Sequence, residues 1–331
     1  MTGLRKCFIG LYITAVIGIA ALAGCGSNNA TGKEVSAEDK NIIYGDTTEK
    51  DEGGANEEKK LIYASFFPVY DLTKRIAGDK MEIRTIIKGT QEPHDFEMES
   101  REMIGILQAD LIIYNGAGME GFIPDLMEMT DDKDKFLDLS QGLTLLEHKD
   151  SEEGDHSRIN PHTWLSIKNA EIELDTIYRK ISSIDPENEP FYKENLEASL
   201  KEFEELDKTF SETLSKVPEE KRYFVVSHAA FNYLAEDYGL KQVAITGISP
   251  EDEPSASQLK TIADFVKRHG ISTIFFEGKA TPKVANTLAE NTGTKTSTLY
   301  TMENLSDEEI SLGYLKLMRL NLEALMESFN G

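Results

Sequence analysis

From Leu61 onward, short apolar runs alternate with longer stretches in which apolar residues recur every three or four positions. Runs rich in Ile, Val, Phe and Tyr predict buried strands, and spacing by three or four predicts amphipathic helices. Regular alternation of the two is typical of β-α-β units built around a parallel sheet. The pattern occurs twice along the chain, so we predict an α/β protein with two similar lobes.

The two sets of predicted elements have the same layout. In the first set, strands are expected at 60–65, 82–87, 110–114 and 136–139, and helices at 69–78, 99–108, 119–129 and 166–184. In the second set, strands are expected at 222–226, 241–245, 272–276 and 295–299, and helices at 229–238, 255–269, 281–292 and 306–329.

Between the two sets, the segment from Pro186 to Val217 has apolar residues spaced by three, four or five. This spacing predicts one long amphipathic helix that joins the lobes as a stiff backbone. We therefore assign 61–185 to the N-terminal lobe, 186–218 to the linking helix and 219–331 to the C-terminal lobe. Ligands of open α/β sheets bind beyond the carboxyl ends of the strands, so we expect the site in the cleft between the lobes.

The first 24 residues carry two basic residues and no acidic one, followed by an apolar run from Phe8 to Leu22. This pattern predicts a secretory signal peptide at 1–24, because the run is shorter than the ~20 residues of a membrane span. The sequence LAGC at 22–25 resembles the lipobox of bacterial lipoproteins, whose cysteine becomes the acylated N-terminus. We expect a lipid on Cys25 that anchors the protein to the extracytoplasmic face of the cell membrane, with a short transmembrane anchor as the alternative.

Residues 25–60 are rich in Asn, Gly, Ser, Thr, Glu, Asp and Lys and contain few apolar residues. Such a composition cannot bury enough surface to fold, so we predict a flexible tether with a reach of ~30 Å. The other cysteine, Cys7, lies in the predicted signal peptide. Disulfide bonds and thiolate metal sites are therefore excluded from the folded body.

The balance of charge narrows the class of partner. The 331 residues include 35 Lys and Arg against 59 Asp and Glu, a formal net charge of -24. An excess of this sign argues against nucleic acid and favours cations as ligands. The length fits roughly two domains, and we expect a monomer.

Three of the six histidines lie at the ends of predicted elements, where α/β proteins place ligand-binding residues. They are His94 in QEPHDFE after the strand at 82–87, His162 in NPHTWLS before the helix at 166–184, and His228 after the strand at 222–226. Imidazole is a good ligand for zinc, copper, iron and nickel. Three such side chains in one cleft would form a metal site.

The other three histidines are given structural or solvated interpretations. His148 and His156 lie in a charged segment, which predicts a solvated insertion with a weak role in collecting metal as the alternative. His269 precedes Gly270 at the end of a predicted helix, where positive charge is favoured.

Five segments together resemble the zinc- and manganese-binding lipoproteins of ABC importers, the TroA-like or cluster A-I group, most nearly its zinc-binding AdcA- and ZnuA-type members. The segments are FPVYD at 67–71, PHDFE at 93–97, NPHTWLS at 160–166, SHAAFNYL at 227–234, and GISPE to EPS at 247–255. The resemblance covers nearly the whole body. It implies capture of a metal ion between two lobes and delivery to a membrane permease and its ATPase.

The resemblance also implies the first three metal ligands. In this family they are the histidines of PHxFE, NPHxW and SHxAFxYL, which correspond to His94, His162 and His228 in this sequence. Manganese-type members tend to carry a carboxylate at the third position. His228 therefore favours Zn²⁺ over Mn²⁺, since nitrogen-rich sites suit zinc better.

The fourth ligand departs from the commoner family pattern. Many members have an Asp early in the loop after the last strand, where this sequence has Tyr300. A subgroup similar to streptococcal zinc lipoproteins has a Glu that aligns with Glu303, and we predict Glu303 as the ligand. Glu277, after the strand at 272–276, is the rival, and the resemblance places it beside the site as a hydrogen-bond partner of an imidazole.

Three imidazoles and one carboxylate would fill a tetrahedral zinc shell and leave no position for a catalytic water. We therefore predict a binding protein and not an enzyme. A zinc hydrolase with Glu303 or Glu277 as general base is the competing function, but the sequence has no His-Glu-x-x-His motif, no Gly-x-Ser-x-Gly motif and no phosphate loop. An adhesin is a third possibility, for which no sequence feature argues.

Overall fold

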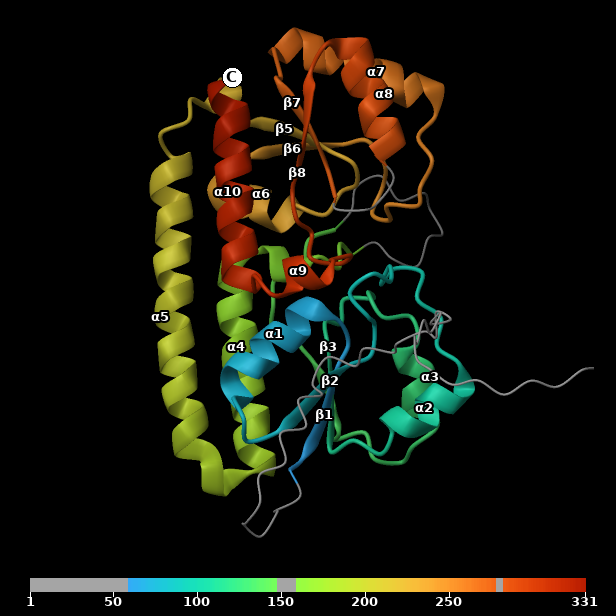
Figure 1. Ribbon diagram of the computed structural model, residues 1–331, viewed down its shortest axis with the longest axis vertical. Coiled ribbons are helices and arrows are strands. Elements are labelled where there is room, and N and C mark those ends of the chain that lie inside the picture. Colours follow the sequence, from blue (N-terminus) through green and yellow to red (C-terminus); the bar gives the residue numbers. More distant parts are fainter. Residues whose placement is uncertain (1–58, 148–158, 278–281) are drawn as a thin grey trace, which may run out of the picture. The chain divides into compact units, whose positions relative to one another are not determined.

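The computed structural model describes residues 59–147, 159–277 and 282–331 (Figure 1). The predicted signal peptide, Cys25, almost all of the predicted tether, His148 and His156 lie outside these residues. Within the described parts of the chain, no helix has both the length and the apolar composition required to span a membrane.

The first sheet has four parallel strands in the order β2-β1-β3-β4. They are β1 (Leu61–Ala64), β2 (Glu82–Thr85), β3 (Leu111–Tyr114) and β4 (Phe136–Asp138). The connections contain α1 (Phe67–Ala77), α2 (Ser100–Ile106) and α3 (Ile123–Glu128). All four residues of β3 are buried, as its unbroken apolar sequence predicts for an interior strand.

The second sheet repeats this arrangement with the order β6-β5-β7-β8, again all parallel. Its strands are β5 (Tyr223–Val226), β6 (Lys241–Ala244), β7 (Thr273–Phe276) and β8 (Lys295–Thr298). Its connecting helices are α6 (Asn232–Tyr238), α7 (Ala256–His269) and α8 (Pro282–Thr292). The prediction of an α/β fold with two similar lobes is confirmed.

In each sheet the strand order reverses between two neighbouring strands, β1 and β3 in the first and β5 and β7 in the second. The chain leaves the carboxyl ends of such neighbours in opposite directions, which opens a crevice at that edge. This crevice is the common ligand position in open parallel sheets.

The lobes are joined by α5 (Glu189–Leu214), a 26-residue helix that follows α4 (Ile167–Ile184). The predicted linking helix begins three residues later than expected, because Pro186–Asn188 forms a separate 3-10 turn. A single buried stripe runs along α5 and packs against α1, α4 and α10 (Tyr314–Asn330). Figure 1 shows α5 running beside both α4 and α10, which lie one after the other along its length.

The last helix differs from the sequence prediction. A single helix was expected at 306–329, whereas the structure has α9 (Asp307–Ile310) followed by α10. The break falls at Gly313, which has a φ of +75° that side chains other than glycine rarely adopt. The helix expected at 229–238 likewise begins only at Asn232, because the preceding residues form a turn after β5.

The apolar core extends through both lobes. One large cluster contains Ile62 of β1 and Phe224 of β5 together with the buried faces of α4, α5 and α10. Within it, the ring of Phe203 from α5 stacks on that of Tyr314 from α10 with 5.2 Å between the centroids. A smaller cluster fills the space between the second sheet and α7 and α8. The long helices therefore pack the two sheets into one body.

The carboxyl group of Glu173 lies inside this core. Glu173 on α4 is 1% exposed, and its Oε1 has no hydrogen-bond partner among the described residues. Burial raises the pKa of Glu173 to about 8, against a smaller opposing effect of the Thr163 hydroxyl. The side chain is therefore mostly protonated at neutral pH.

We expect Glu173 to make the protein less stable as the pH rises. In the unfolded chain a Glu loses its proton near pH ~4.3, so between that pH and about 8 the native state binds the extra proton. The contribution of Glu173 to the free energy of unfolding must then fall with rising pH. Glu173→Gln should reduce this fall between pH 5.5 and 8.5 by about 3 kcal/mol.

Denaturant unfolding of the full-length chain at both pH values measures the effect. Glu194→Gln, at an exposed position of α5, is the matched control and should retain the wild-type pH dependence. A pH dependence unchanged by Glu173→Gln would contradict the interpretation.

Candidate metal centre

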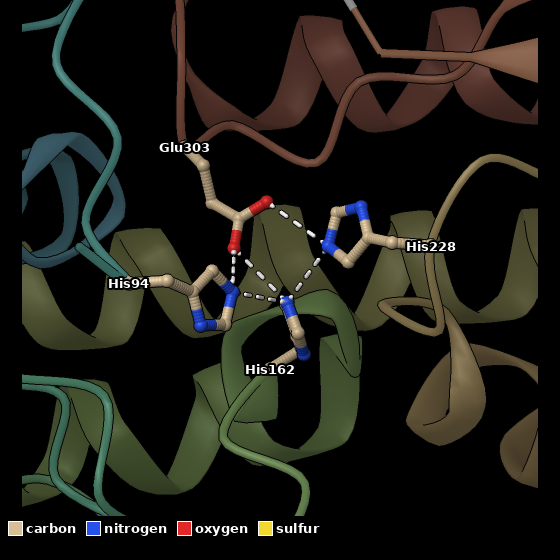
Figure 2. A group of neighbouring side chains, drawn as sticks. All are labelled: His94, His162, His228 and Glu303. Atoms are coloured by element: carbon tan, nitrogen blue, oxygen red, sulfur yellow. Dashed lines mark hydrogen bonds and ion pairs between the residues drawn. The ribbon is translucent and has the colours of Figure 1, made fainter. Parts of the chain in front are cut away.

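Four side chains from separate parts of the chain meet in one buried group, formed by His94, His162, His228 and Glu303. One ligand atom from each lies within 4.8 Å of all the others. Figure 2 shows three imidazole rings and a carboxylate turned toward a common point. The side chain of His94 is 9% exposed, and those of the other three are at most 1% exposed.

The ring nitrogens and carboxylate oxygens of this group lie close together. Nε2 of His162 lies 3.2 Å from Nε2 of His94 and 3.0 Å from Nε2 of His228. Oε1 of Glu303 lies 3.0 Å from Nε2 of both His94 and His162, and its Oε2 lies 3.4 Å from Nε2 of His228. Each histidine therefore presents the same ring nitrogen.

The second lobe brings His228 to the crevice of its sheet. His228 lies two residues beyond β5, and Glu277 directly follows the neighbouring strand β7. Nδ1 of His228 forms an ion pair with Oε1 of Glu277 at 2.5 Å, and the Ser227 hydroxyl donates to the same oxygen. Glu277 thus contacts the ring from the side opposite Nε2, as the family resemblance implied, and is not one of the four grouped side chains.

His162 is held by the segment before α4. The side-chain oxygen of Asn160 accepts from the His162 backbone N–H at 3.0 Å and contacts its Nδ1 at 2.8 Å. Two residues further on, the indole of the buried Trp164 donates to the carbonyl oxygen of Thr301 at 2.7 Å. This last bond ties the segment of His162 to the segment of Glu303.

Glu303 lies in the loop between β8 and α9, and this loop is anchored on both sides. The Asn321 side chain on α10 accepts from Tyr300 N at 2.7 Å and donates to Tyr300 O at 2.9 Å. Met302 has a φ of +67°, an unfavourable conformation for a residue with a side chain. The surrounding bonds hold the chain in this bend immediately before Glu303.

The electrostatics of the group follow from burial and mutual contact. Burial lowers the pKa of His162 to about 3, although Glu303 acts in the opposite sense, so this imidazole is neutral. Burial opposes a charge on His228 too, but Glu277 and Glu303 outweigh it and raise the pKa of His228 well above 6.5. Burial also disfavours a charged Glu303, yet His162 and His228 hold its pKa well below 4.5.

This donor set has the composition of a zinc site. Neutral imidazole nitrogens and a carboxylate oxygen bind borderline cations such as Zn²⁺, while oxygen-rich sets suit Mg²⁺, Ca²⁺ and Mn²⁺. The anionic carboxylate supplies negative charge in a place from which water is largely excluded. A divalent cation at the common point would therefore be stabilised by both kinds of ligand.

Sequence reasoning missed Glu92. Its side chain accepts from the backbone N–H of His94 at 3.3 Å, and its pKa is raised to about 7 by burial and by the nearby charge of Glu303. The only signal in the sequence is an acidic residue two positions before a candidate ligand, which is too common to be informative. His269, by contrast, contacts the ring of Phe265 with centroids 4.2 Å apart and precedes Gly270 at the end of α7. It lies outside the group, which agrees with its structural interpretation.

Two α/β lobes and a buried group of three imidazoles and one carboxylate are the features of the metal-binding proteins that the sequence resembles. Comparison with known proteins gives the family. The model of the family ZnuA, described as zinc-uptake complex component A, periplasmic, matches residues 62–328. The chain belongs to this family.

Named relatives agree with the assignment. The chain is 37% identical over 296 residues to the high-affinity zinc uptake system protein ZnuA of Bacillus subtilis strain 168, covering 86% of this chain and 92% of that protein. It is 37% identical over 281 residues to the zinc-binding lipoprotein AdcA of Streptococcus pneumoniae R6, covering 82% of this chain and 56% of AdcA. The chain thus spans little more than half the length of AdcA.

A solved structure matches the fold as well. The Zn(II)-bound ZnuA-like domain of Streptococcus pneumoniae AdcA superposes with a TM-score of 0.71 at 35% identity, covering 82% of this chain and all of that domain.

We expect Glu277→Gln to lower the pKa of His228. The substitution removes one of the two carboxylates that raise this pKa, while burial continues to disfavour the charged ring. The pKa can be read from the pH dependence of the histidine ring NMR signals of the full-length, metal-free chain. Glu253→Gln, at an exposed position, should leave it unchanged. A wild-type pKa in Glu277→Gln would contradict the assigned role of Glu277.

Proposed function

We propose that this protein captures Zn²⁺ outside the cytoplasm and delivers it to an ABC permease driven by its ATPase. His94, His162, His228 and Glu303 are the proposed ligands. The observation that carries the proposal is the convergence of three Nε2 atoms and a carboxylate in one buried group, in a chain of the zinc-uptake family.

The spacing of the donor atoms supports zinc. A tetrahedron with metal–ligand distances of ~2.0–2.1 Å has edges of ~3.3 Å. The nitrogen–nitrogen and nitrogen–oxygen separations given above run from 3.0 to 3.4 Å. These five separations lie close to the edge length of such a tetrahedron. Histidine at position 228, with three nitrogens in all, favours Zn²⁺ over Mn²⁺.

A filled tetrahedral shell also accounts for capture without catalysis. Hydrolytic zinc sites keep one position open for water, whereas four protein ligands occupy every position. The relatives described above are named for zinc uptake and zinc binding. This protein is accordingly a binding protein and not an enzyme, and the zinc ion is its cargo.

The N-terminal region supplies the proposed location. Residues 1–24 act as a signal peptide, Cys25 carries the lipid, and residues 25–60 form the tether. The folded part comprises a lobe at 61–185, the linking helix at 186–218 and a lobe at 219–331, and it acts as a monomer. Support comes from the lipobox-like sequence at 22–25 and from the relative named as a lipoprotein.

Zinc affinity should depend more on Glu303 than on Glu277. Glu303→Gln removes the only anionic ligand and should weaken Zn²⁺ binding by at least ~100-fold, while Glu277→Gln leaves four donors in place and should cost ~10-fold. Competition of the full-length chain in detergent with a chelating dye measures both affinities. A larger loss in Glu277→Gln would identify Glu277 as the ligand and overturn the proposed set.

The anchor can be tested with a matched pair of cysteine variants. Cys25→Ser should abolish incorporation of labelled fatty acid and release the protein from the membrane fraction, because the acylated atom is missing. Cys7→Ser alters the only other cysteine and should retain both label and membrane association. Labelling that survives in Cys25→Ser would refute lipidation at this residue.

A further inference from the structure

Asn160 makes hydrogen bonds through every polar atom it has, and it does so between the two lobes. Its side-chain oxygen accepts from His162 N and contacts His162 Nδ1, as described above. Its side-chain nitrogen donates to Ala229 O at 2.9 Å and to Asn232 Oδ1 at 3.1 Å. The residue is 1% exposed, so water does not compete for these bonds.

The orientation of this amide is fixed by two backbone groups. The backbone N–H of His162 can only donate, so the atom facing it must be the amide oxygen. The carbonyl of Ala229 can only accept, so the atom facing it must be the amide nitrogen. Rotation of the amide by 180° would break both bonds.

The fixed amide determines the tautomer of His162. Because the amide oxygen is an acceptor only, the contact of 2.8 Å requires a hydrogen on His162 Nδ1. A neutral imidazole then has its lone pair on Nε2, the atom that faces His94, His228 and Glu303. The opposite tautomer would place a hydrogen where the cation has to bind.

The Asn160 side chain also bonds to the turn that carries His228 in the second lobe. Ala229, whose carbonyl it binds, is the residue after His228. Asn232 Oδ1 is oriented by a second donor, Gln242 Nε2 at 2.7 Å, and the Tyr233 hydroxyl donates to Asn160 O at 2.7 Å. The turn that carries His228 is therefore bonded to the segment that carries His162.

We propose that Asn160 is a positioning residue that presents Nε2 of His162 to the cation and holds His162 and His228 at a fixed separation across the lobes. The inference rests on the proposed zinc-binding function for its effect on affinity. The tautomer it assigns to His162 does not depend on zinc.

Two substitutions separate the two roles of the Asn160 side chain, which are to accept from Nδ1 of His162 and to donate to Ala229 and Asn232. A third substitution is a control for the hydrogen bonds that hold the segment around His162 in place. Asn160→Ala removes both roles. Asn160→Asp keeps an acceptor for Nδ1 but loses the donor to Ala229 and Asn232. Asn115→Ala is the control, because Asn115 binds Pro161 O at 2.8 Å and accepts from Thr163 Oγ1 at 2.8 Å without contacting His162.

The first readout is the ring nitrogen NMR spectrum of the full-length, metal-free chain with ¹⁵N-labelled histidine, assigned through the signal missing in His162→Gln. We expect the Nδ1–H form of His162 in the wild type, in Asn160→Asp and in Asn115→Ala, and a mixture of tautomers in Asn160→Ala. A wild-type His162 in the Nε2–H form overturns the inference, whether or not any variant folds.

The second readout is Zn²⁺ affinity by dye competition, with the thermal transition as a check on folding. Asn160→Ala should lose ~10- to 100-fold, Asn160→Asp should lose less, and Asn115→Ala should stay within about threefold. Wild-type affinity in Asn160→Ala, or an equal loss in Asn115→Ala, overturns the inference and leaves the zinc function standing. A wild type that binds no zinc overturns the function while the tautomer result still stands.

Discussion

The structure depends on holding three imidazoles and a carboxylate within hydrogen-bond distance of one another, largely out of water. Burial disfavours every charged form in this group, and an isolated buried carboxylate would be protonated. Glu303 remains anionic because His162 and His228 lie against it. Without metal the group therefore holds an anionic Glu303 beside a charged His228 and a neutral His162, and binding of a divalent cation would release the proton from His228.

The fold produces this group by repeating one arrangement twice. Each sheet reverses its strand order beside its first strand, and in the second sheet this crevice holds both His228 and its partner Glu277. The His162 segment and the Glu303 loop are joined by the bond from Trp164 to Thr301, while Asn321 of α10 fixes the loop from behind. Because α4, α5 and α10 share one core with both sheets, the segments that carry the ligands are attached to one packed core.

Much of this arrangement could be predicted from the sequence, because it follows from local periodicity. The strands lie within two residues of their predicted ends, and His162 and His228 stand near element ends as expected. His94 lies within the loop between β2 and α2, nine residues after β2. The break at Gly313 could not be predicted, because the apolar spacing continues across it and does not indicate the positive φ of this residue. The roles of Asn160 and Asn321 could not be found either, since they depend on which backbone groups from distant segments face one amide.

X-ray absorption at the zinc edge of the zinc-loaded, full-length protein tests the central claim most directly. The account predicts four-coordinate zinc with three imidazole nitrogens and one carboxylate oxygen at ~2.0–2.2 Å and no water. A shell with fewer than three imidazoles, or one that retains its carboxylate contribution in Glu303→Gln, would contradict it.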